Sequence, residues 1–447
     1  MVGGAHPTVM TNVTIVGGGW AGLATAIELC QHGVPVTLIE AARQLGGRAR
    51  CVAFDAERVD NGQHLMIGAY RETLRLLTLV HAPAPVRRRL QLRMHTFADE
   101  FALIAPHLPA PLHLVAALLS ARGINAHERR SALRFCIALA FRRFQLAQDI
   151  GLAQLLAQHR QTPRLIACLW EPLCLATLNT PLNEASAQVF LAVLRDAFAR
   201  RRADSDLLFA ATDLGQTFPA PALEFIERHG GRVILGERAT ELRIANHAIA
   251  AVVTAQQLHA SQHVVLATPA YATARLLAPH APLHTIAHNL EQLNYEPICT
   301  VYLRYPAHVT LNTDMVGFTG TLMQWLVDRA HCDQPGLMAA VISARGAHMN
   351  LNNEELTQRV RDEIAQRYPA WPAPYNSMVI REKRATFTCR VGINVLRPAN
   401  TTPVRGLWLA GDYTATGYPA TLEGAVRSGM ECARKILAVL KSMPISN

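Results

Sequence analysis

Residues 13–29 read VTIVGGGWAGLATAIEL, and this stretch decides the fold. A short β-branched strand over residues 12–16 runs directly into glycines, and a helical pattern follows over residues 21–32. A second strand is expected at residues 36–40. Strand, helix and strand in this order predict a parallel βαβ unit at the front of the chain.

Three glycines at the first turn have the spacing Gly17-x-Gly19-x-x-Gly22. The first permits the tight turn, the second lets a pyrophosphate approach the backbone, and the third allows the helix to pack closely on the strand. The start of the helix adds free N–H groups and a positive dipole end for phosphates. Glu40 ends the second strand, where a carboxylate binds both ribose hydroxyls and repels the 2′-phosphate of NADP. The motif therefore predicts a dinucleotide site that disfavours NADP.

The chain is long and apolar enough for two domains. It has 447 residues, 50% of them hydrophobic, whereas a single core stops growing near about 250–300 residues. The nine cysteines form no CxxC pair, and several lie in apolar runs. This pattern is typical of reduced thiols packed in a core, so neither a disulfide framework nor a metal site is expected.

The positive charge of the chain is spread over short clusters. The net charge is +10, but the arginines form no long run, and aromatic residues, at 6%, are not interleaved with them. A nucleic-acid partner is therefore not expected. No apolar run reaches the about 18–20 residues of a spanning helix, and the first residues lack the features of a signal peptide. The expected location is the cytoplasm.

Further strands and helices are expected far from the first βαβ unit. The strands are predicted at residues 233–235, 248–254, 263–267, 300–305, 337–343 and 407–410, and the helices at residues 353–367 and 423–440. We therefore predict an α/β fold with a discontinuous, Rossmann-like nucleotide domain and an inserted α+β domain. The nucleotide domain is expected at residues 1–95, 205–268 and 398–441, and the inserted domain at residues 96–204 and 269–397.

Residues 40–49 read EAARQLGGRA, and residues 59–68 read VDNGQHLMIG. The first run resembles the extension of the dinucleotide fingerprint in flavoproteins of the amine-oxidase and carotenoid-desaturase superfamily. That resemblance implies FAD as the cofactor, with Gly46, Gly47 and Arg48 beside its pyrophosphate. The second run resembles the loop beside the flavin ring, which implies a flavin contact for Gly62.

Residues 406–429 read GLWLAGDYTATGYPATLEGAVRSG and resemble the C-terminal flavin motif of the same superfamily. The resemblance implies that Gly411 and Asp412 meet the ribityl or pyrophosphate region. It also implies that the helix starting near Leu422 and Glu423 points its N-terminus at the flavin, where the helix dipole stabilises negative charge. A weaker match, at residues 236–239, implies that the backbone of Ala239 contacts the adenine.

The middle of the chain carries a closer resemblance. Residues 60–77, 169–198 and 205–226 are similar to the squalene-associated FAD-dependent desaturases, also described as hydroxysqualene dehydroxylases. This resemblance implies reduction of hydroxysqualene to squalene in bacterial hopanoid or related triterpene synthesis. An apolar triterpene is the expected substrate, and prenyl synthases are expected partners. The sequence has no second nucleotide fingerprint for NAD(P)H, so an external electron donor for the flavin is also expected.

Dehydroxylation of an allylic alcohol needs an apolar tunnel, an acid near the hydroxyl group, and exclusion of water. The stretches 101–119, 133–146 and 185–194 are rich in Leu, Ala and Phe and can line such a tunnel. His64, in the loop expected beside the flavin, is the leading candidate for the acid. Asp213, which can equally cap a helix, and Tyr418, in the loop before the last helix, are the other catalytic candidates.

An insoluble substrate would be taken from a bilayer, so peripheral contact with the inner membrane surface is also expected. Arg129, Arg130, Arg142 and Arg143 flank the apolar residues 135–141, a combination that suits an anionic interface.

Three alternatives remain open from the sequence. A carotenoid-type desaturase or isomerase would use the same flavin in the opposite redox direction. An amine oxidase would need aromatic residues around the amine, for which Tyr413 and Tyr418 are the available residues. A non-catalytic flavin scaffold would deliver a prenyl intermediate to a neighbouring synthase.

Overall fold

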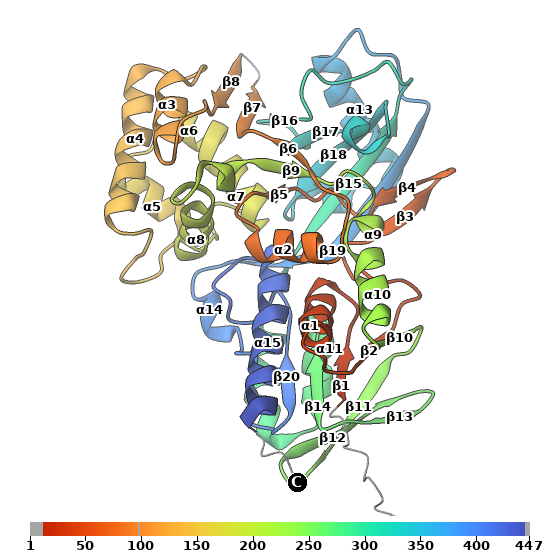
Figure 1. Ribbon diagram of the computed structural model, residues 1–447. Helices are drawn as coiled ribbons and strands as arrows, with labels where there is room; N and C mark the ends of the chain where they lie inside the picture. The colour runs from red at the N-terminus through yellow and green to blue at the C-terminus, as the bar shows by residue number, and fades with distance from the viewer. Residues whose placement is uncertain (1–11, 97–98, 443–447) are drawn as a thin grey trace, which may run out of the picture.

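The computed structural model describes residues 12–96 and 99–442. Its lower half in Figure 1 is built on a five-stranded, all-parallel sheet with strand order β10-β2-β1-β14-β20. These strands come from three distant parts of the chain: β1 (Val13–Val16), β2 (Val36–Glu40), β10 (Arg232–Leu235), β14 (His263–Leu266) and β20 (Leu407–Leu409). Because one sheet is built from three distant segments of the chain, the nucleotide domain is discontinuous, as expected.

Helices cover this sheet. They are α1 (Trp20–Gln31), α10 (Pro219–Arg228), α11 (Ala270–Leu277) and α15 (Leu422–Ser442). The first and last helical segments of the domain, α1 and α15, lie in direct contact, and a Cβ at Gly429 would stand 2.2 Å from the carbonyl oxygen of Ala21. A three-stranded antiparallel sheet lies at the foot of the domain: β11 (Ala239–Ala245), β12 (Ala248–Thr254) and β13 (Leu258–Ala260).

The second half contains a seven-stranded sheet with strand order β19-β15-β18-β17-β16-β7-β8. All neighbours are antiparallel except the parallel pair β16 and β7. The strands are β7 (Gln91–His95), β8 (Glu100–Ile104), β15 (Tyr295–Arg304), β16 (Met315–Phe318), β17 (Trp325–Asp328), β18 (Leu337–Ser343) and β19 (Asn376–Phe387). Helix α13 (Asn353–Arg367) packs on β15 and β19.

A helical layer stands beside this sheet, at the left of Figure 1. It contains α3 (Leu112–Ser120), α4 (Ala126–Phe141), α5 (Leu152–Gln158), α6 (Pro163–Leu165), a π-helical turn (Ile166–Trp170), α7 (Glu171–Leu178) and α8 (Ala187–Phe198). None of the helices described in residues 12–96 and 99–442 is both long and apolar enough to cross a bilayer.

Short elements connect the two halves. They are the hairpin β3 (Cys51–Phe54) and β4 (Glu57–Asp60), the sheet β5 (Met66–Ile67), β9 (Leu207–Phe209) and β6 (Val86–Arg88), and the helices α2 (Arg71–Leu79), α9 (Leu214–Thr217), α12 (His284–Glu291) and α14 (Ile393–Leu396). Through them, segments far apart in sequence reach the space between the domains.

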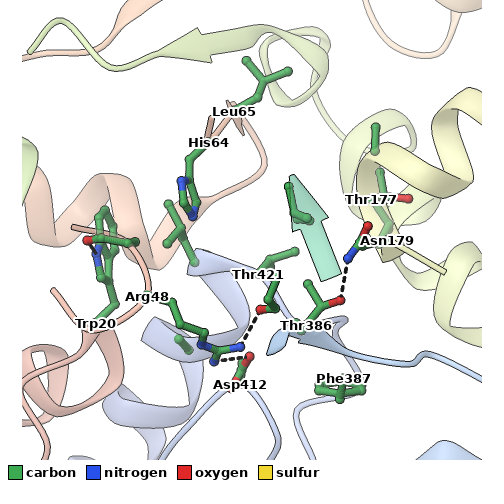
Figure 2. Close-up of a pocket in the computed structure, with 18 of the residues that line it drawn as sticks. Trp20, Arg48, His64, Leu65, Thr177, Asn179, Thr386, Phe387, Asp412 and Thr421 are labelled. Atoms are coloured by element: carbon green, nitrogen blue, oxygen red, sulfur yellow. Dashed lines mark hydrogen bonds and ion pairs between the residues drawn. The ribbon is translucent and has the colours of Figure 1, made fainter. Parts of the chain in front are cut away.

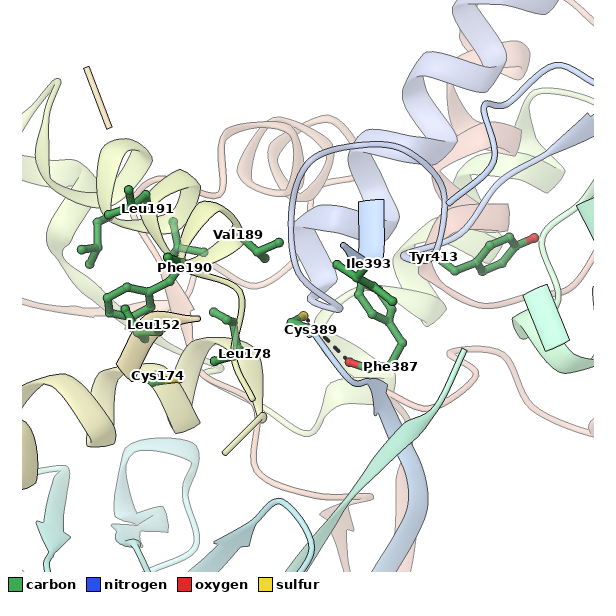
Figure 3. Packing of buried hydrophobic residues seen from close by; sticks show 14 of the residues in the cluster. Leu152, Cys174, Leu178, Val189, Phe190, Leu191, Phe387, Cys389, Ile393 and Tyr413 are labelled. Carbon is green, nitrogen blue, oxygen red and sulfur yellow. Dashed lines mark hydrogen bonds between the residues drawn. The ribbon is translucent and has the colours of Figure 1, made fainter. Parts of the chain in front are cut away.

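Buried hydrophobic residues from both domains form the core. Figure 3 shows Cys174 and Cys389 among Leu178, Val189 and Phe190. All nine cysteines are free; Cys136 is half-buried and the others are buried. Burial raises the pKa of Cys389 to about 12. The thiols therefore pack as small apolar groups.

Several predicted elements match the structure residue for residue, among them β2, β12, β18 and α13. Two details differ. Strand β7, inside the expected nucleotide segment 1–95, pairs with β8 and β16 in the seven-stranded sheet. The stretch 101–119, expected to line a tunnel, begins in strand β8 before it becomes helix α3. The remaining domain limits stay a prediction, and residues 1–11 lie outside the described chain.

Candidate active site

A cavity of about 1160 Å³ extends from the glycine-rich turn after β1 to the helical layer of the second domain. Its nucleotide end is lined by Gly17, Gly19 and Glu40, and its other end by apolar side chains of α3, α4, α7 and α8. Figure 2 shows the region between them, where Arg48, His64, Asn179 and Asp412 lie around the same space. One cavity thus joins the expected cofactor site to the expected substrate site.

The glycines of the first turn have different spatial constraints. Gly17 has φ of +113°, and a Cβ there would lie 2.6 Å from the carbonyl oxygen of Ala267. A Cβ at Gly22 would lie 1.9 Å from the carbonyl oxygen of Gly17, so this glycine is needed for helix–strand contact. At Gly19, which lines the cavity, a Cβ would meet nothing within 4 Å. The open space at the start of α1 suits a pyrophosphate.

The carboxylate of Glu40 is oriented by the backbone. Its Oε2 accepts a hydrogen bond from the N–H of Gly18 at 2.6 Å, and its Oε1 accepts one from the N–H of Ala42 at 2.7 Å. Lone pairs remain on both oxygens for ribose hydroxyls. Ala239 and Arg238 line the same end of the cavity, where the adenine is expected.

An ion pair joins the first and last motifs of the chain. Arg48 donates from Nη2 to Oδ2 of Asp412 at 2.7 Å and from Nη1 to the carbonyl oxygen of Ala385 at 2.6 Å. Burial alone would lower the pKa of Arg48, but the Asp412 carboxylate outweighs it, so the pKa is raised. Arg48 is therefore a permanent cation in the middle of the cavity wall.

The other glycines of these motifs also line the cavity. They are Gly46, Gly47, Gly62 and Gly411. A Cβ at Gly47 would approach the Cα of Gly19 at 3.2 Å, so the two glycine loops touch.

The start of α15 reaches the cavity through Leu422 but not through Glu423. The buried Glu423 carboxylate instead accepts hydrogen bonds from the N–H of Thr73 at 3.0 Å, its hydroxyl at 2.7 Å, and Nε of Arg427 at 2.8 Å. It thereby satisfies the N-terminal turn of α2. The Glu423 side chain therefore does not line the cavity, whereas the start of its helix does, through Thr421, Leu422 and Ala425.

His64 lies in the cavity wall, as expected. Its Nδ1 is 2.9 Å from the carbonyl oxygen of Gly62, which makes Nδ1 the protonated nitrogen and leaves a lone pair on Nε2. Burial lowers the pKa of His64, and Arg48 lowers it further against the opposing effect of Asp60. The imidazole is therefore neutral near pH 7.

A buried ion pair anchors the loop that carries His64. Nη1 of Arg329 donates to Oδ2 of Asp60 at 2.5 Å and to Oε1 of Gln63 at 3.0 Å. Tyr302 donates from its hydroxyl to the carbonyl oxygen of Asp60 at 3.0 Å. No motif signals Arg329, because it follows an ordinary buried strand, β17.

Neither of the other two catalytic candidates reaches the cavity. The Asp213 carboxylate caps α9, accepting from the N–H groups of Gly215 at 2.8 Å and Gln216 at 3.2 Å. Tyr418 is buried in the core of the nucleotide domain, with the guanidinium of Arg427 4.2 Å above its ring. The expected catalytic roles of both residues are therefore wrong: the Asp213 carboxylate caps a helix, and the Tyr418 side chain packs in the core.

Polar atoms without a protein partner mark residues that sequence reasoning missed. The indole N–H of Trp325 and the hydroxyl of Tyr295 line the cavity and have no hydrogen-bond partner among the described residues. Trp325 is 6% exposed. Burial raises the pKa of Tyr295 to about 12, so its hydroxyl remains protonated. A buried donor without a partner is costly and often indicates a ligand.

The apolar end of the cavity confirms the expected tunnel. None of the residues that α3, α4, α7 and α8 contribute to its wall is charged. The lining from the three predicted stretches includes Leu103, Leu114, Val115, Leu118, Leu133, Ile137, Leu139, Val193 and Leu194. This end can hold a long hydrocarbon chain and exclude water from it.

The residues present fit FAD. The open space at Gly19 would admit a pyrophosphate, the Glu40 carboxylate would bind a ribose, and the start of α15 would contribute to the binding of the flavin ring. Arg48 adds a cation between these positions.

Comparison with curated proteins gives relatives over nearly the full chain. A protein of Rhodopseudomonas palustris named hydroxysqualene dehydroxylase is 28% identical over 95% of this chain and 98% of its own length. One of the same name from Zymomonas mobilis is 25% identical, with the same shares covered. The zeta-carotene desaturase of Zea mays is 23% identical over 93% of this chain and 82% of its own length.

Solved structures share the fold. An oxidoreductase of Methanosarcina mazei superimposes with a TM-score of 0.76 at 13% identity, covering 95% of this chain and 100% of its own. Cyclohexylamine oxidase of Brevibacterium oxydans gives a TM-score of 0.72 at 16% identity, covering 96% and 99%. These matches confirm the predicted fold class.

The family model described as flavin containing amine oxidoreductase matches residues 20–437, which is most of the chain. The match confirms FAD as the cofactor and agrees with the nucleotide end of the cavity. The chain is an FAD-dependent oxidoreductase and belongs to the flavin containing amine oxidoreductase family.

Proposed function

We propose that this enzyme reduces hydroxysqualene to squalene in hopanoid or related triterpene synthesis. The observation that carries the proposal is the junction in one cavity of an uncharged apolar arm with a polar centre at Arg48 and His64. The full-length relatives named hydroxysqualene dehydroxylase support it. The apolar arm suits the hydrocarbon chains, and the polar centre suits the single hydroxyl group.

In the proposed reaction, the hydroxyl group accepts a proton and leaves as water, and a hydride replaces it. Reduced FAD supplies that hydride. The apolar walls stabilise the bound hydrocarbon and keep out water that would trap an allylic cation. Trp325 and Tyr295 can donate hydrogen bonds to the substrate oxygen while neutral. His64 is the proposed proton carrier: Nε2 would first take up a proton that originates from solvent and then pass it to the hydroxyl group, and the lowered pKa makes that proton easy to release.

The electrons are proposed to come from an external donor. The prenyl synthases that make the substrate are proposed neighbours in the same reaction sequence.

The direct test is anaerobic incubation of the purified protein, with its FAD chemically reduced, with hydroxysqualene. We expect squalene by mass spectrometry, together with re-oxidation of the flavin absorbance. Recovery of unchanged hydroxysqualene with a flavin that stays reduced would contradict the proposal.

A desaturase is the second candidate, favoured by relatives such as the zeta-carotene desaturase of Zea mays. The apolar arm would equally accept a linear polyene, and the flavin would start oxidised. Incubating oxidised enzyme with squalene and with carotenoid precursors tests this direction. An amine substrate has less support, because Arg48, Arg275 and Arg384 are among the five arginines that line the cavity. A flavin scaffold would bind FAD without any flavin redox change when substrate is added.

A further inference from the structure

Helices α3 and α4 lie at the edge of the molecule, at the left of Figure 1, and they carry several exposed apolar side chains. Phe141 is 86% exposed, Leu112 54%, Leu119 51% and Ile137 45%. The two helices are in contact, so these exposed side chains lie on adjoining helices. Apolar side chains grouped at one edge suggest a binding surface rather than scattered surface residues.

The same two helices carry the wall of the cavity on an adjacent face. On α3, Leu112 and Leu119 are seven residues apart and share the exposed side, whereas Leu114, Val115 and Leu118 line the cavity. Ile137 of α4 belongs to both faces, because it lines the cavity and is half-exposed. Its neighbour Ala140 also lines the cavity and is exposed. The cavity wall therefore reaches the surface beside the exposed apolar residues.

Positive charge accompanies this apolar face. Arg130 and Arg134 lie on the same side of α4 as Ile137 and Phe141, at spacings of four, three and four residues. Arg142 and Arg143 follow directly, and Arg122 precedes the helix; all five arginines are exposed. Within the described chain, none of them forms an ion pair.

The structure changes which residues form the interface expected from sequence. Phe135, in the expected apolar stretch, is buried in the core. Arg129 is folded back and donates from Nη2 to the carbonyl oxygen of Ala121 at 2.7 Å. The outward set is Leu112, Leu119, Ile137 and Phe141 with the five arginines, and we name it the α3–α4 face.

We propose that the α3–α4 face docks on an anionic lipid bilayer, with the cavity opening at Ile137 as the entrance for substrate. Apolar side chains would enter the acyl boundary, and the arginines without an ion-pair partner would meet the phosphates. The entry of a triterpene alcohol rests on the proposed function, but the docking itself does not. An enzyme docked in this way takes an insoluble substrate directly from the membrane.

Flotation of the intact flavin-loaded protein with vesicles tests the docking. We expect the wild type to float with phosphatidylcholine vesicles containing phosphatidylglycerol, and to float several-fold less with phosphatidylcholine alone. The paired variant Leu112→Ser/Phe141→Ser should lose most of this binding, and Arg142→Glu/Arg143→Glu should lose its dependence on anionic lipid. Neither pair lines the cavity.

Matched controls lie elsewhere on the surface. Val395, 82% exposed, and Tyr375, 69% exposed, are apolar residues outside the face, and Arg228 is an exposed arginine of α10. Val395→Ser, Tyr375→Ser and Arg228→Glu should float like the wild type. Flavin content and thermal unfolding verify that every variant is folded.

Two results would overturn the docking proposal: equal flotation of face and control variants, or a concentration-dependent dimer that only the face variants lose. The latter would assign the face to a second copy of the chain. Turnover of hydroxysqualene in detergent solution separates the two proposals, since it bypasses the bilayer. Normal turnover in detergent without vesicle binding would reject the docking proposal and leave the proposed reaction standing. Vesicle binding without turnover would reject the proposed reaction and leave the docking proposal standing.

Discussion

Arg329 and Asp60 form an ion pair inside the protein, with Nη1 of the arginine 2.5 Å from Oδ2 of the carboxylate and both side chains almost fully buried. They are 269 residues apart in the chain. Asp60 also accepts from the N–H of Leu214 at 2.7 Å. The pair therefore connects the loop of His64 to β17 and α9.

The first prediction is that Asp60→Asn destabilises the protein by about 3–5 kcal/mol, because it leaves the Arg329 cation buried without its counter-charge. Urea unfolding measures the change. Glu241→Gln is the control: its partner Arg243 is exposed, and loss of that surface pair should cost less than about 1 kcal/mol. Equal effects of the two substitutions would show that the buried pair has no special role.

The second prediction separates two glycines of one motif. Gly19→Val should leave the apoprotein folded, since its side chain enters open space, but should reduce bound FAD several-fold. Gly22→Ala should lower the unfolding temperature, because its Cβ would stand 1.9 Å from the carbonyl oxygen of Gly17. Flavin absorbance per protein and apoprotein melting give the two readouts. Normal FAD content in Gly19→Val would remove the pyrophosphate from this position.

The third prediction concerns His64. His64→Ala should bind FAD normally yet lose most turnover of hydroxysqualene, on the order of 10²-fold or more for a proton-transfer group. The control is Asp213→Asn, which removes a charge from a helix cap outside the cavity and should retain turnover. Unchanged turnover in His64→Ala would exclude it as the proton carrier.

The fourth prediction is that the protein loses stability as the pH is lowered from about 7 to about 5. Burial lowers the pKa of His64 below its ordinary 6.5, and the pKa values of His263 and His331 are lowered by burial as well. The unfolded chain then binds more protons than the folded one as pH falls through 6.5, so folding weakens. In unfolding measurements over this pH range, the free energy of unfolding of His64→Gln should fall less than that of the wild type. An identical pH dependence would show that His64 protonates as easily when folded.

The fifth prediction concerns Trp325. Trp325→Phe keeps most of the ring but removes the N–H that has no protein partner. Stability should be nearly unchanged, whereas kcat/KM for the alcohol should fall about 5–10-fold, the equivalent of one hydrogen bond. Binding of squalene, which has no hydroxyl group, should not change. A loss of squalene binding would indicate a packing role instead.

Part of the site could be predicted because its constraints are local. The turn after β1 needs glycine at position 17 for its φ of +113° and at position 22 for its close contact with Gly17, and Glu40 follows at the end of the next strand. The residue composition of α3, α4 and α8 likewise predicts the apolar character of the tunnel. These features depend on hydrogen bonds, steric limits and hydropathy along short stretches, which sequence patterns record directly.

Long-range packing decided the rest. Glu423 faces α2 rather than the cavity because the rotation of α15 is set by its contacts with α1 and α2. The positions of Tyr418 and Asp213 outside the cavity also depend on long-range packing, since a motif does not state which way a loop side chain turns. The sequence by itself determined a flavin-binding fold with an apolar tunnel, because those depend on local pattern. Only the tertiary structure brought Arg329 to Asp60 and Arg48 to Asp412, because partners hundreds of residues apart meet through the packing of the whole chain.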